Sequence, residues 1–257
     1  MRTSYAVQRA ALVVACAVVA SRGAAQSVAR RVQQVKHGTV HMSFASRPDV
    51  CGYGKNGVTI LSRNRQQRDE WIHECEHGPV RVAFDLADGS VVAVRTYVGG
   101  RWRAPDDAVD LGTVPVKDAV DYLLDNATRG SGKGATDAIF PATIADTVVV
   151  WPRLLQIARD DTRQREVRTQ AVFWVSQAAG EKASEGLADV VSDASGDREV
   201  RLQAVFALSQ RHEDGVTALL TVARTNKDPE IRKRAIFWLG QSKDDRALAY
   251  FESILKR

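Results

Sequence analysis

The sequence predicts an α+β protein in which a small antiparallel β-rich module is followed by an α-helical region of stacked repeats. Three observations carry this prediction: an apolar segment near the N-terminus, short alternating runs up to about residue 112, and a motif that recurs three times in the C-terminal half. Alternation with period two is typical of half-buried strands, and self-similarity at a fixed spacing is typical of solenoids. We therefore expect three segments, 1–25, 26–112 and 113–257.

Residues 1–25 have the layout of a secretory signal peptide. Arginines precede an apolar run over residues 10–20, and small residues follow it. That run is about half of the roughly 20 residues that cross a bilayer, and no later run is longer, so no transmembrane segment is expected. The residues up to Cys16 also resemble a relaxed lipobox, but the apolar run continues past that cysteine. We expect a periplasmic or secreted protein and disfavour a lipid anchor at Cys16.

Charge gives no reason to expect a nucleic-acid partner. Residues 1–25 carry three arginines and no acid, so without them 33 Lys and Arg face 31 Asp and Glu, a net charge of +2. A balance this close to zero supplies little attraction for phosphate backbones.

Removal of the same segment leaves two cysteines, Cys51 and Cys75. Two cysteines in an oxidising compartment most often pair. Closing a loop of this size removes unfolded-state entropy worth about 3–4 kcal/mol. We therefore expect a disulfide that clamps the β-rich module.

The strands of that module are indicated by alternation and turn residues. TVHMSFAS places Val40, Met42 and Phe44 on one face, and GVTILS is a second short run. PVRVAFDLADGSVVAVRTYVGG holds two β-rich runs around Asp88-Gly89, a pair that favours a tight hairpin turn.

Two glycine-rich stretches, CGYGKNG from Cys51 and GSGKGAT from Gly130, superficially suggest phosphate loops. Neither satisfies G-x-x-x-x-G-K-[ST], because Asn56 and Gly134 follow the lysines. Both are expected to be surface loops, and no cofactor is expected.

The stretch His73-Glu74-Cys75-Glu76-His77 matches the H-E-x-x-H pattern of zinc peptidases. Zincins need both histidines on a helix that continues and a third ligand from a later element. Gly78-Pro79 would stop such a helix at once, and no glutamate follows until Glu166. We expect no catalytic or metal site, although an exported zinc-dependent hydrolase remains the alternative and incidental metal binding stays open.

The C-terminal half repeats a 13-residue pattern. The copies are REVRTQAVFWVSQ from Arg165, REVRLQAVFALSQ from Arg198 and PEIRKRAIFWLGQ from Pro229. Each indicates the first helix of a pair, with Asp197 and Asp228 as N-caps and a weaker Gln164 in the first copy. GVTALLTVAR is the clearest second helix, since its apolar residues recur with helical spacing.

Upstream, WPRLLQIAR from Trp151 matches GVTALLTVAR, and AIFPATIAD from Ala138 is expected to be its first helix. A further helix is predicted after Pro115, because Val120, Leu123, Leu124 and Ala127 share one face.

The repeated residues resemble HEAT repeats, particularly the short bacterial class named after phycobilisome lyases, over residues 133–257. The resemblance implies a right-handed stack of antiparallel helix pairs and a role in binding other proteins. It thus implies a non-enzymatic interaction scaffold, which export would place in the bacterial cell envelope, with an unidentified protein or peptide partner. Self-association and a mainly structural role stay open.

Equivalent positions in the copies suggest roles. Three phenylalanines are expected in the core: Phe173, Phe206 and Phe237. Three arginines are expected to reach acids or carbonyls of adjacent repeats, and are secondary candidates for partner contacts: Arg168, Arg201 and Arg232. Trp174 and Trp238 are the remaining candidates for partner binding.

Overall fold

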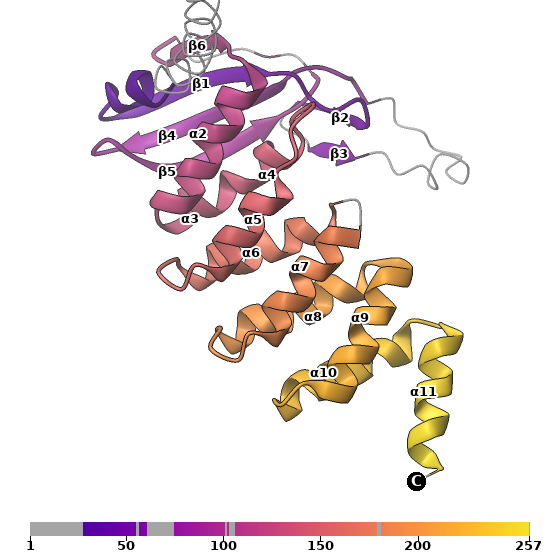
Figure 1. Ribbon diagram of the computed structural model, residues 1–257. Coiled ribbons are helices and arrows are strands. Elements are labelled where there is room, and N and C mark those ends of the chain that lie inside the picture. Colours follow the sequence, from indigo (N-terminus) through magenta and orange to yellow (C-terminus); the bar gives the residue numbers. More distant parts are fainter. Residues whose placement is uncertain are drawn as a thin grey trace, which may run out of the picture. The chain divides into compact units, whose positions relative to one another are not determined.

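The structure is a computed structural model that describes residues 28–54, 57–60, 75–100, 102, 106–178 and 181–256 (Figure 1). The expected export segment, 1–25, including Cys16, lies outside the described residues. Residues 28–33 are helical, the strands follow, and the other helices come after the strands, which confirms the predicted α+β class. Among the described residues, no helix has the length and apolar character needed to span a bilayer.

The chain forms two compact units, Met1–Val148 and Val149–Arg257. The chain changes from strands to helices between Thr113, where β6 ends, and Val116, where α2 begins. The compact units divide further along the chain, so the helices before residue 148 belong with the strands.

The first unit is built on a four-stranded sheet in the order β5-β4-β1-β6. Its strands are β1 (Gly38–Phe44), β4 (Val80–Ala87), β5 (Ser90–Tyr97) and β6 (Val109–Thr113). β1 pairs antiparallel with β4, and β4 with β5, but β6 runs parallel to β1. The antiparallel pairs predicted for this module are present, and β6, a strand whose short sequence shows no clear alternation, joins them in parallel.

The predicted hairpin is confirmed. β4 and β5 are joined by Asp88 and Gly89, whose φ angles of 50° and 73° place both residues in the left-handed region. Two such residues form the turn type whose twist matches that of paired strands, and Asp-Gly adopts it readily.

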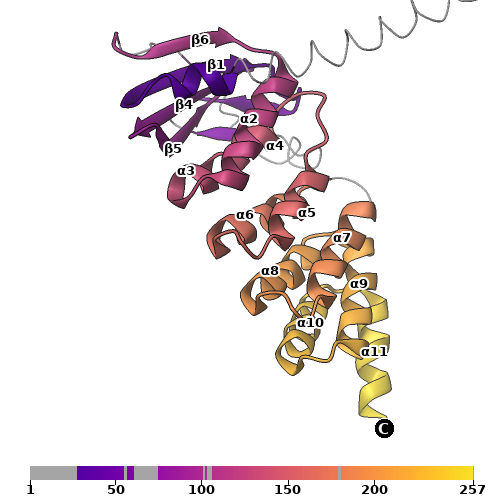
Figure 2. The ribbon, with the colours of Figure 1, turned by 60° about the vertical axis from the view of Figure 1, so that its left-hand side comes forward.

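One face of this sheet forms the core of the first unit. Val40, Met42 and Phe44 are at most 1% exposed, as their alternation predicts. α2 (Val116–Arg129) covers the sheet (Figure 2). Its Tyr122 ring meets the Phe84 ring edge-on, with the ring centroids 5.3 Å apart. The predicted helix after Pro115 is thus confirmed.

Two expectations for the following residues were wrong. GSGKGAT forms helix α3 (Gly132–Asp137) instead of a surface loop, because Gly134 lets it approach β5 so closely that a Cβ would lie 2.1 Å from the Val91 carbonyl oxygen. AIFPATIAD holds the short helix α4 (Ile139–Thr143), which packs against α2 and α3 and does not begin a repeat.

The disulfide joins Cys51 to Cys75, with Cα atoms 5.5 Å apart. Cys51 lies on β2 (Val50–Gly52), which pairs with β3 (Val58–Ile60). Beyond the disulfide, Glu76 exchanges two backbone hydrogen bonds of 3.0 Å with Gly52. The crosslink and this short bridge hold the same two segments together.

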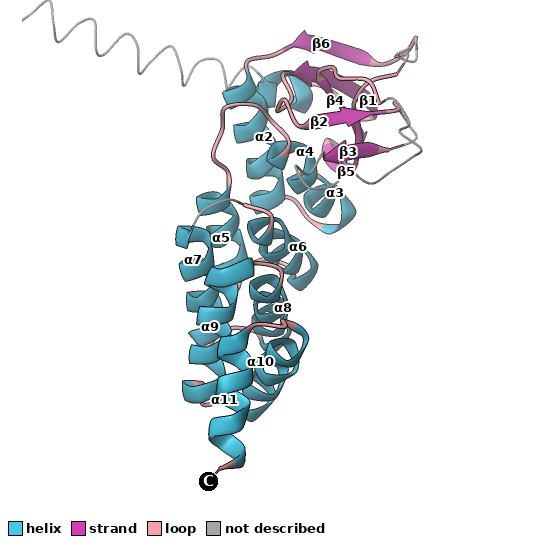
Figure 3. Ribbon diagram, turned by 90° about the vertical axis from the view of Figure 1, so that its right-hand side faces the viewer, coloured by secondary structure: helices cyan, strands magenta, loops and turns pink. Residues whose placement is uncertain are grey.

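The second unit is an array of antiparallel helices. They are α5 (Trp151–Arg159), α6 (Arg165–Ser176), α7 (Glu181–Ser192), α8 (Arg198–Ser209), α9 (His212–Thr225), α10 (Pro229–Gln241) and α11 (Asp245–Leu255). Within the array, α6, α8 and α10 form one layer, and α5, α7, α9 and α11 form the other (Figure 3). This is the layered arrangement that the repeats predict.

The helix caps follow the sequence. Asp197 accepts hydrogen bonds from the N–H groups of Glu199 and Val200, and Asp228 accepts one from Glu230. Gln164 makes no side-chain capping bond to α6. These observations confirm the two strong caps and the weaker first one.

The three repeated phenylalanines are not core residues, so that prediction was wrong. Phe173 and Phe206 are half-buried, whereas Phe237 is 53% exposed. The Phe206 ring lies 5.2 Å from that of Trp238 on α10, the next helix of its layer. Among the described helices none follows α10 in this layer, which leaves Phe237 uncovered.

Candidate functional site

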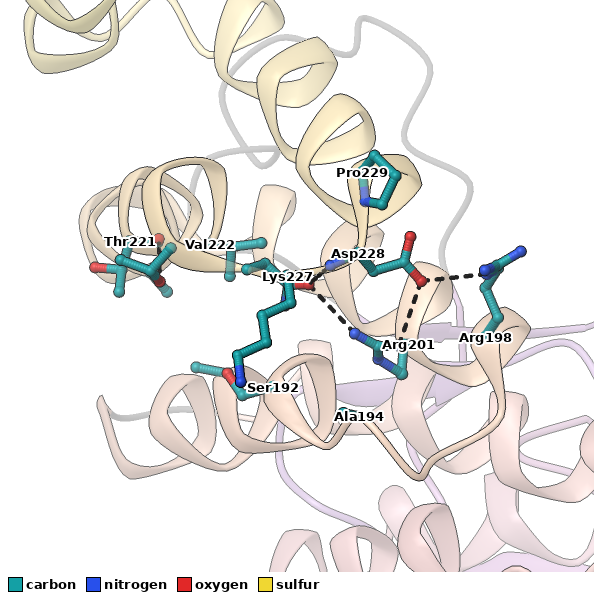
Figure 4. Close-up of a pocket in the computed structure, with 13 residues that line it drawn as sticks. Ser192, Ala194, Arg198, Arg201, Thr221, Val222, Lys227, Asp228 and Pro229 are labelled. Atoms are coloured by element: carbon teal, nitrogen blue, oxygen red, sulfur yellow. Dashed lines mark hydrogen bonds and ion pairs between the residues drawn. The ribbon is translucent and has the colours of Figure 1, made fainter.

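The second unit has a groove between α7 and α9, with a volume of about 710 Å³ (Figure 4). Ala188 and Ser192 line it from α7, and Ala218 and Thr221 line it from α9. The turns that lead into α8 and α10 close one end. The volume lies within the range of roughly 300–1,000 Å³ that is common for binding pockets.

Small and hydroxyl-bearing side chains make the groove both apolar and able to form hydrogen bonds. Ala188 and Ala218 are half-buried, whereas Thr221 and Thr225 are exposed. Thr221 donates its hydroxyl to the Thr217 carbonyl at 3.2 Å, and Thr225 donates to the Thr221 carbonyl at 2.8 Å. Because these protons are used within α9, the hydroxyl oxygens can accept from a ligand N–H.

The closed end of the groove carries charge. Asp228 Oδ2 accepts from Arg198 Nε at 3.2 Å and from Arg201 Nη1 at 3.5 Å, and its Oδ1 accepts from the Glu230 N–H at 3.0 Å. Burial opposes ionisation of Asp228, but the Glu230 hydrogen bond and the Arg198 charge outweigh it and lower the pKa of the carboxyl. Asp228 is thus ionised and engaged within the protein.

Lys227 adds a cation at the same end. Its side chain extends over the groove in the direction of Ser192 (Figure 4). Within the described residues no carboxylate pairs with its ammonium group, and Arg198 uses only Nε toward Asp228. The groove therefore offers two cationic groups with unused donors to a ligand.

The repeated arginines are placed as ladder residues. Arg168 and Arg201 are buried, and each donates Nε to a carbonyl near the end of the preceding helix, Ala158 at 3.2 Å and Val191 at 3.0 Å. Arg232 instead donates to the carbonyls of Asn226 and Lys227. The three therefore satisfy helix ends and turns, and Arg201 alone of them lines the groove.

The two candidate tryptophans lie in the other helix layer. Trp174 packs edge-on against Phe173, and Trp238 contacts both Phe206 and Phe237. Both indoles are half-buried, and neither lines the groove. The candidate residues from the sequence are therefore not brought together in one site.

The HECEH stretch is only partly described, because His73 and Glu74 lie outside the described residues. Cys75 is in the disulfide, and residues 75–79 are not helical. His77 places Nδ1 2.9 Å from the Val50 carbonyl oxygen. In the described residues, no group of three or more His, Cys, Asp and Glu side chains is arranged to hold a metal ion.

Sequence reasoning named Arg201 and Asp228 for other roles and missed most of the other residues that line the groove. Ala188, Ser192 and Lys227 fall outside the repeated 13-residue pattern that drew attention to the array. Their signal lies in the second helices and turns, where the copies differ from one another.

The comparison with family models agrees with the helical array. Residues 184–257 match the model for HEAT repeats, which covers the groove and the last helices. No curated protein is found to match the chain.

Proposed function

We propose that this HEAT-like repeat protein is a non-enzymatic scaffold of the bacterial cell envelope that binds a protein or peptide through its helical array. HEAT repeats are consistent with such a role, because stacked helix pairs create an extended surface that needs no enclosed pocket. The observation that carries the proposal is the open groove between α7 and α9.

An envelope location is supported by two features of the chain. The N-terminal residues have the layout of an export signal, and the disulfide Cys51–Cys75 suits an oxidising compartment. Fractionation of cells that produce the full chain should find it outside the cytoplasm, with a mature N-terminus near residue 26. Recovery of the protein in the cytoplasmic fraction, with residues 1–25 still attached, would contradict this part of the proposal.

Binding through the groove is tested with one blocking variant and one control. Thr221→Trp places an indole at an exposed position in the groove, and Lys233→Trp places the same side chain on the exposed surface of α10. Chemical crosslinking in envelope extract should yield a defined adduct with the wild type and with Lys233→Trp. Thr221→Trp should lose that adduct while its circular dichroism stays unchanged.

The zinc-hydrolase alternative makes a different prediction. It requires His73 and His77 to hold a zinc ion beside Glu74, so the purified mature protein would contain about one zinc per chain and would show chelator-sensitive peptidase activity. Elemental analysis of the protein with its disulfide intact decides between the two functions.

A further inference from the structure

The groove exists because one repeat departs from its neighbours. Leu154, Leu187 and Leu219 are equivalent core positions of α5, α7 and α9, and none is more than 1% exposed. The position directly after this leucine is Leu155 in α5, Ala188 in α7 and Leu220 in α9. Four residues after that position, one turn along the helix, come Arg159, Ser192 and Arg224, respectively. The middle helix therefore has a small side chain at two positions where both neighbours have a large one.

In the first interface these large side chains fill the space between helices. A Cβ on Gly186 of α7 would lie 2.2 Å from Leu155 Cδ1, so the leucine packs directly on the α7 backbone. Arg159 crosses to α7, where its Nη2 donates to the Gly186 carbonyl at 3.2 Å and to Asp189 Oδ2 at 3.1 Å. The cavity at the corresponding end of this interface measures only about 10 Å³.

The third interface is bridged in a related way. Leu220 is 8% exposed, and the Arg224 guanidinium lies over the Tyr250 ring of α11, 5.3 Å from its centroid. Between α7 and α9, by contrast, Ala188 and Ser192 are too short to reach across. The groove, with a volume of about 710 Å³, therefore lies at the place where a leucine and a bridging arginine stand between the neighbouring helices of the array.

We propose, on the basis of the binding function above, that this groove takes an acidic peptide segment with a leucine-sized aliphatic side chain. The aliphatic group enters between Ala188 and Ala218, where the neighbouring interface holds Leu155. Carboxylates beside it pair with Lys227 and Arg198.

Charge at the groove favours an acidic segment. Arg198, Arg201 and Lys227 are its cations and Asp228 is its acid, and Asp228 is already engaged by both arginines. Arg201 is buried, so Lys227 and Arg198 are the cations that a ligand can reach. The threonine hydroxyl oxygens of α9 can accept hydrogen bonds from peptide N–H groups, which an inorganic anion would not supply.

The direct test measures fluorescence anisotropy of labelled ten-residue peptides with the full mature chain. One peptide has a central leucine flanked by glutamates, a second replaces the leucine by alanine, and a third replaces the glutamates by glutamines. The first peptide should bind, and each of the others should bind at least about fivefold more weakly. Equal binding of the first two peptides, or of the first and third, would overturn the proposal.

Variants place the binding in the groove. The double variant Ala188→Leu/Ser192→Arg restores the neighbouring repeat's residues and should abolish binding of the acidic leucine peptide. Lys227→Ala should weaken it roughly fivefold, whereas Lys233→Ala on α10 should leave it unchanged. Urea unfolding checks that each variant is folded. Full binding by the refilled double variant would refute the assignment.

The same experiments distinguish the acidic peptide from other possible ligands of the groove. Sedimentation that shows a dimer lost in Ala188→Leu/Ser192→Arg would assign the groove to a second copy and overturn the peptide proposal. If envelope crosslinking depends on the groove while the acidic peptide does not bind, the scaffold function stands and the proposed partner chemistry fails. If the peptide binds but no envelope adduct forms, the groove chemistry stands and the scaffold role fails.

Discussion

The two units of this protein differ in the sequence separation of the residues that contact each other. In the first unit, Ser43 on β1 contacts Thr113, the last residue of β6, and these residues are 70 positions apart. In the second unit, Arg201 binds a carbonyl 10 residues away, and Arg165 pairs with Asp197 32 residues away. The sheet therefore depends on distant segments, whereas each helix of the array depends on its neighbours.

This difference has consequences for stability. An array of repeats behaves approximately as a sum of repeat stabilities and nearest-neighbour interfaces, so damage should remain near its origin. A sheet assembled from distant segments should lose its order as a whole. Four perturbations, taken from the largest expected effect to the smallest, test this contrast.

The largest effect should come from Arg201→Ala. This change removes a buried guanidinium that binds Val191, Asn226 and Asp228, and should lower the stability of the array by about 3–5 kcal/mol. Hydrogen exchange read by mass spectrometry should show faster exchange in α7 and α8 with β1 unaffected. Arg198→Ala, which removes an exposed ion pair to the same carboxylate, is the control and should cost less than about 1 kcal/mol.

Loss of the disulfide should act on the other unit. The double variant Cys51→Ser/Cys75→Ser should destabilise the first unit by about 2–4 kcal/mol, because the unfolded chain gains the freedom of the 24-residue loop. Urea unfolding, followed by hydrogen exchange of β1 and β4, measures the change. An equal loss of protection in α8 would mean that the two units unfold together.

A smaller effect is expected at the caps of the array. Asp197→Ala removes two capping bonds from α8 and should cost about 1 kcal/mol. Gln164→Asp should stabilise α6 by roughly 0.5–1 kcal/mol, because the backbone there has nearly the same angles as at Asp197. The thermal unfolding midpoints of the two variants should shift in opposite directions, and a shift in the same direction would contradict the assignment of Gln164 as a weak N-cap.

Mild acid should produce the smallest effect, and it should lower the stability of the first unit at a higher pH than that of the second. Burial lowers the pKa of His41 below 6.5; Asp110 and Asp85 oppose this, and Arg95 reinforces it. Because the unfolded state then binds the proton more tightly, the first unit should lose stability as the pH falls below 6.5 toward the folded pKa.

The second unit should respond only at lower pH. The Ser195 hydroxyl hydrogen bond lowers the pKa of Asp193, and the Arg246 side chain lowers that of Asp244 to about 2, both from 3.8. Their contribution is present above pH 3.8 and is lost as the pH falls through the folded pKa values. Hydrogen exchange of β1 and α8 between pH 7 and 4 measures the difference, and His41→Phe should remove the response of β1.

The sequence predicted local features well and contacts between distant segments poorly. The hairpin at Asp88-Gly89 and the cap at Asp197 follow from residues within a few positions of each other, and both are present. β6 and α3 were missed, since β6 pairs with a strand some 70 residues earlier and α3 depends on the close approach of Gly134 to β5. Neither partner is visible from the local pattern.

The candidate site shows the same limit. Repetition identified Arg168 and Arg201, because residues that hold an array together recur in each copy, whereas the tryptophans recur in only two of the three copies. The groove was missed because Ala188 and Ser192 matter by being smaller than their equivalents. Missing volume is apparent only when the flanking helices are in place.

The sequence by itself determined that a β-rich region precedes layered helix pairs, where most helices and the hairpin begin and end, and which cysteines pair. These features depend on backbone preferences, on periodic burial and on there being only two cysteines in the expected mature chain. The tertiary structure alone decided that β6 joins the sheet in parallel, that Phe237 stays exposed, and that space remains between α7 and α9. Those outcomes depend on how side chains from separate elements fill, or fail to fill, the volume between them.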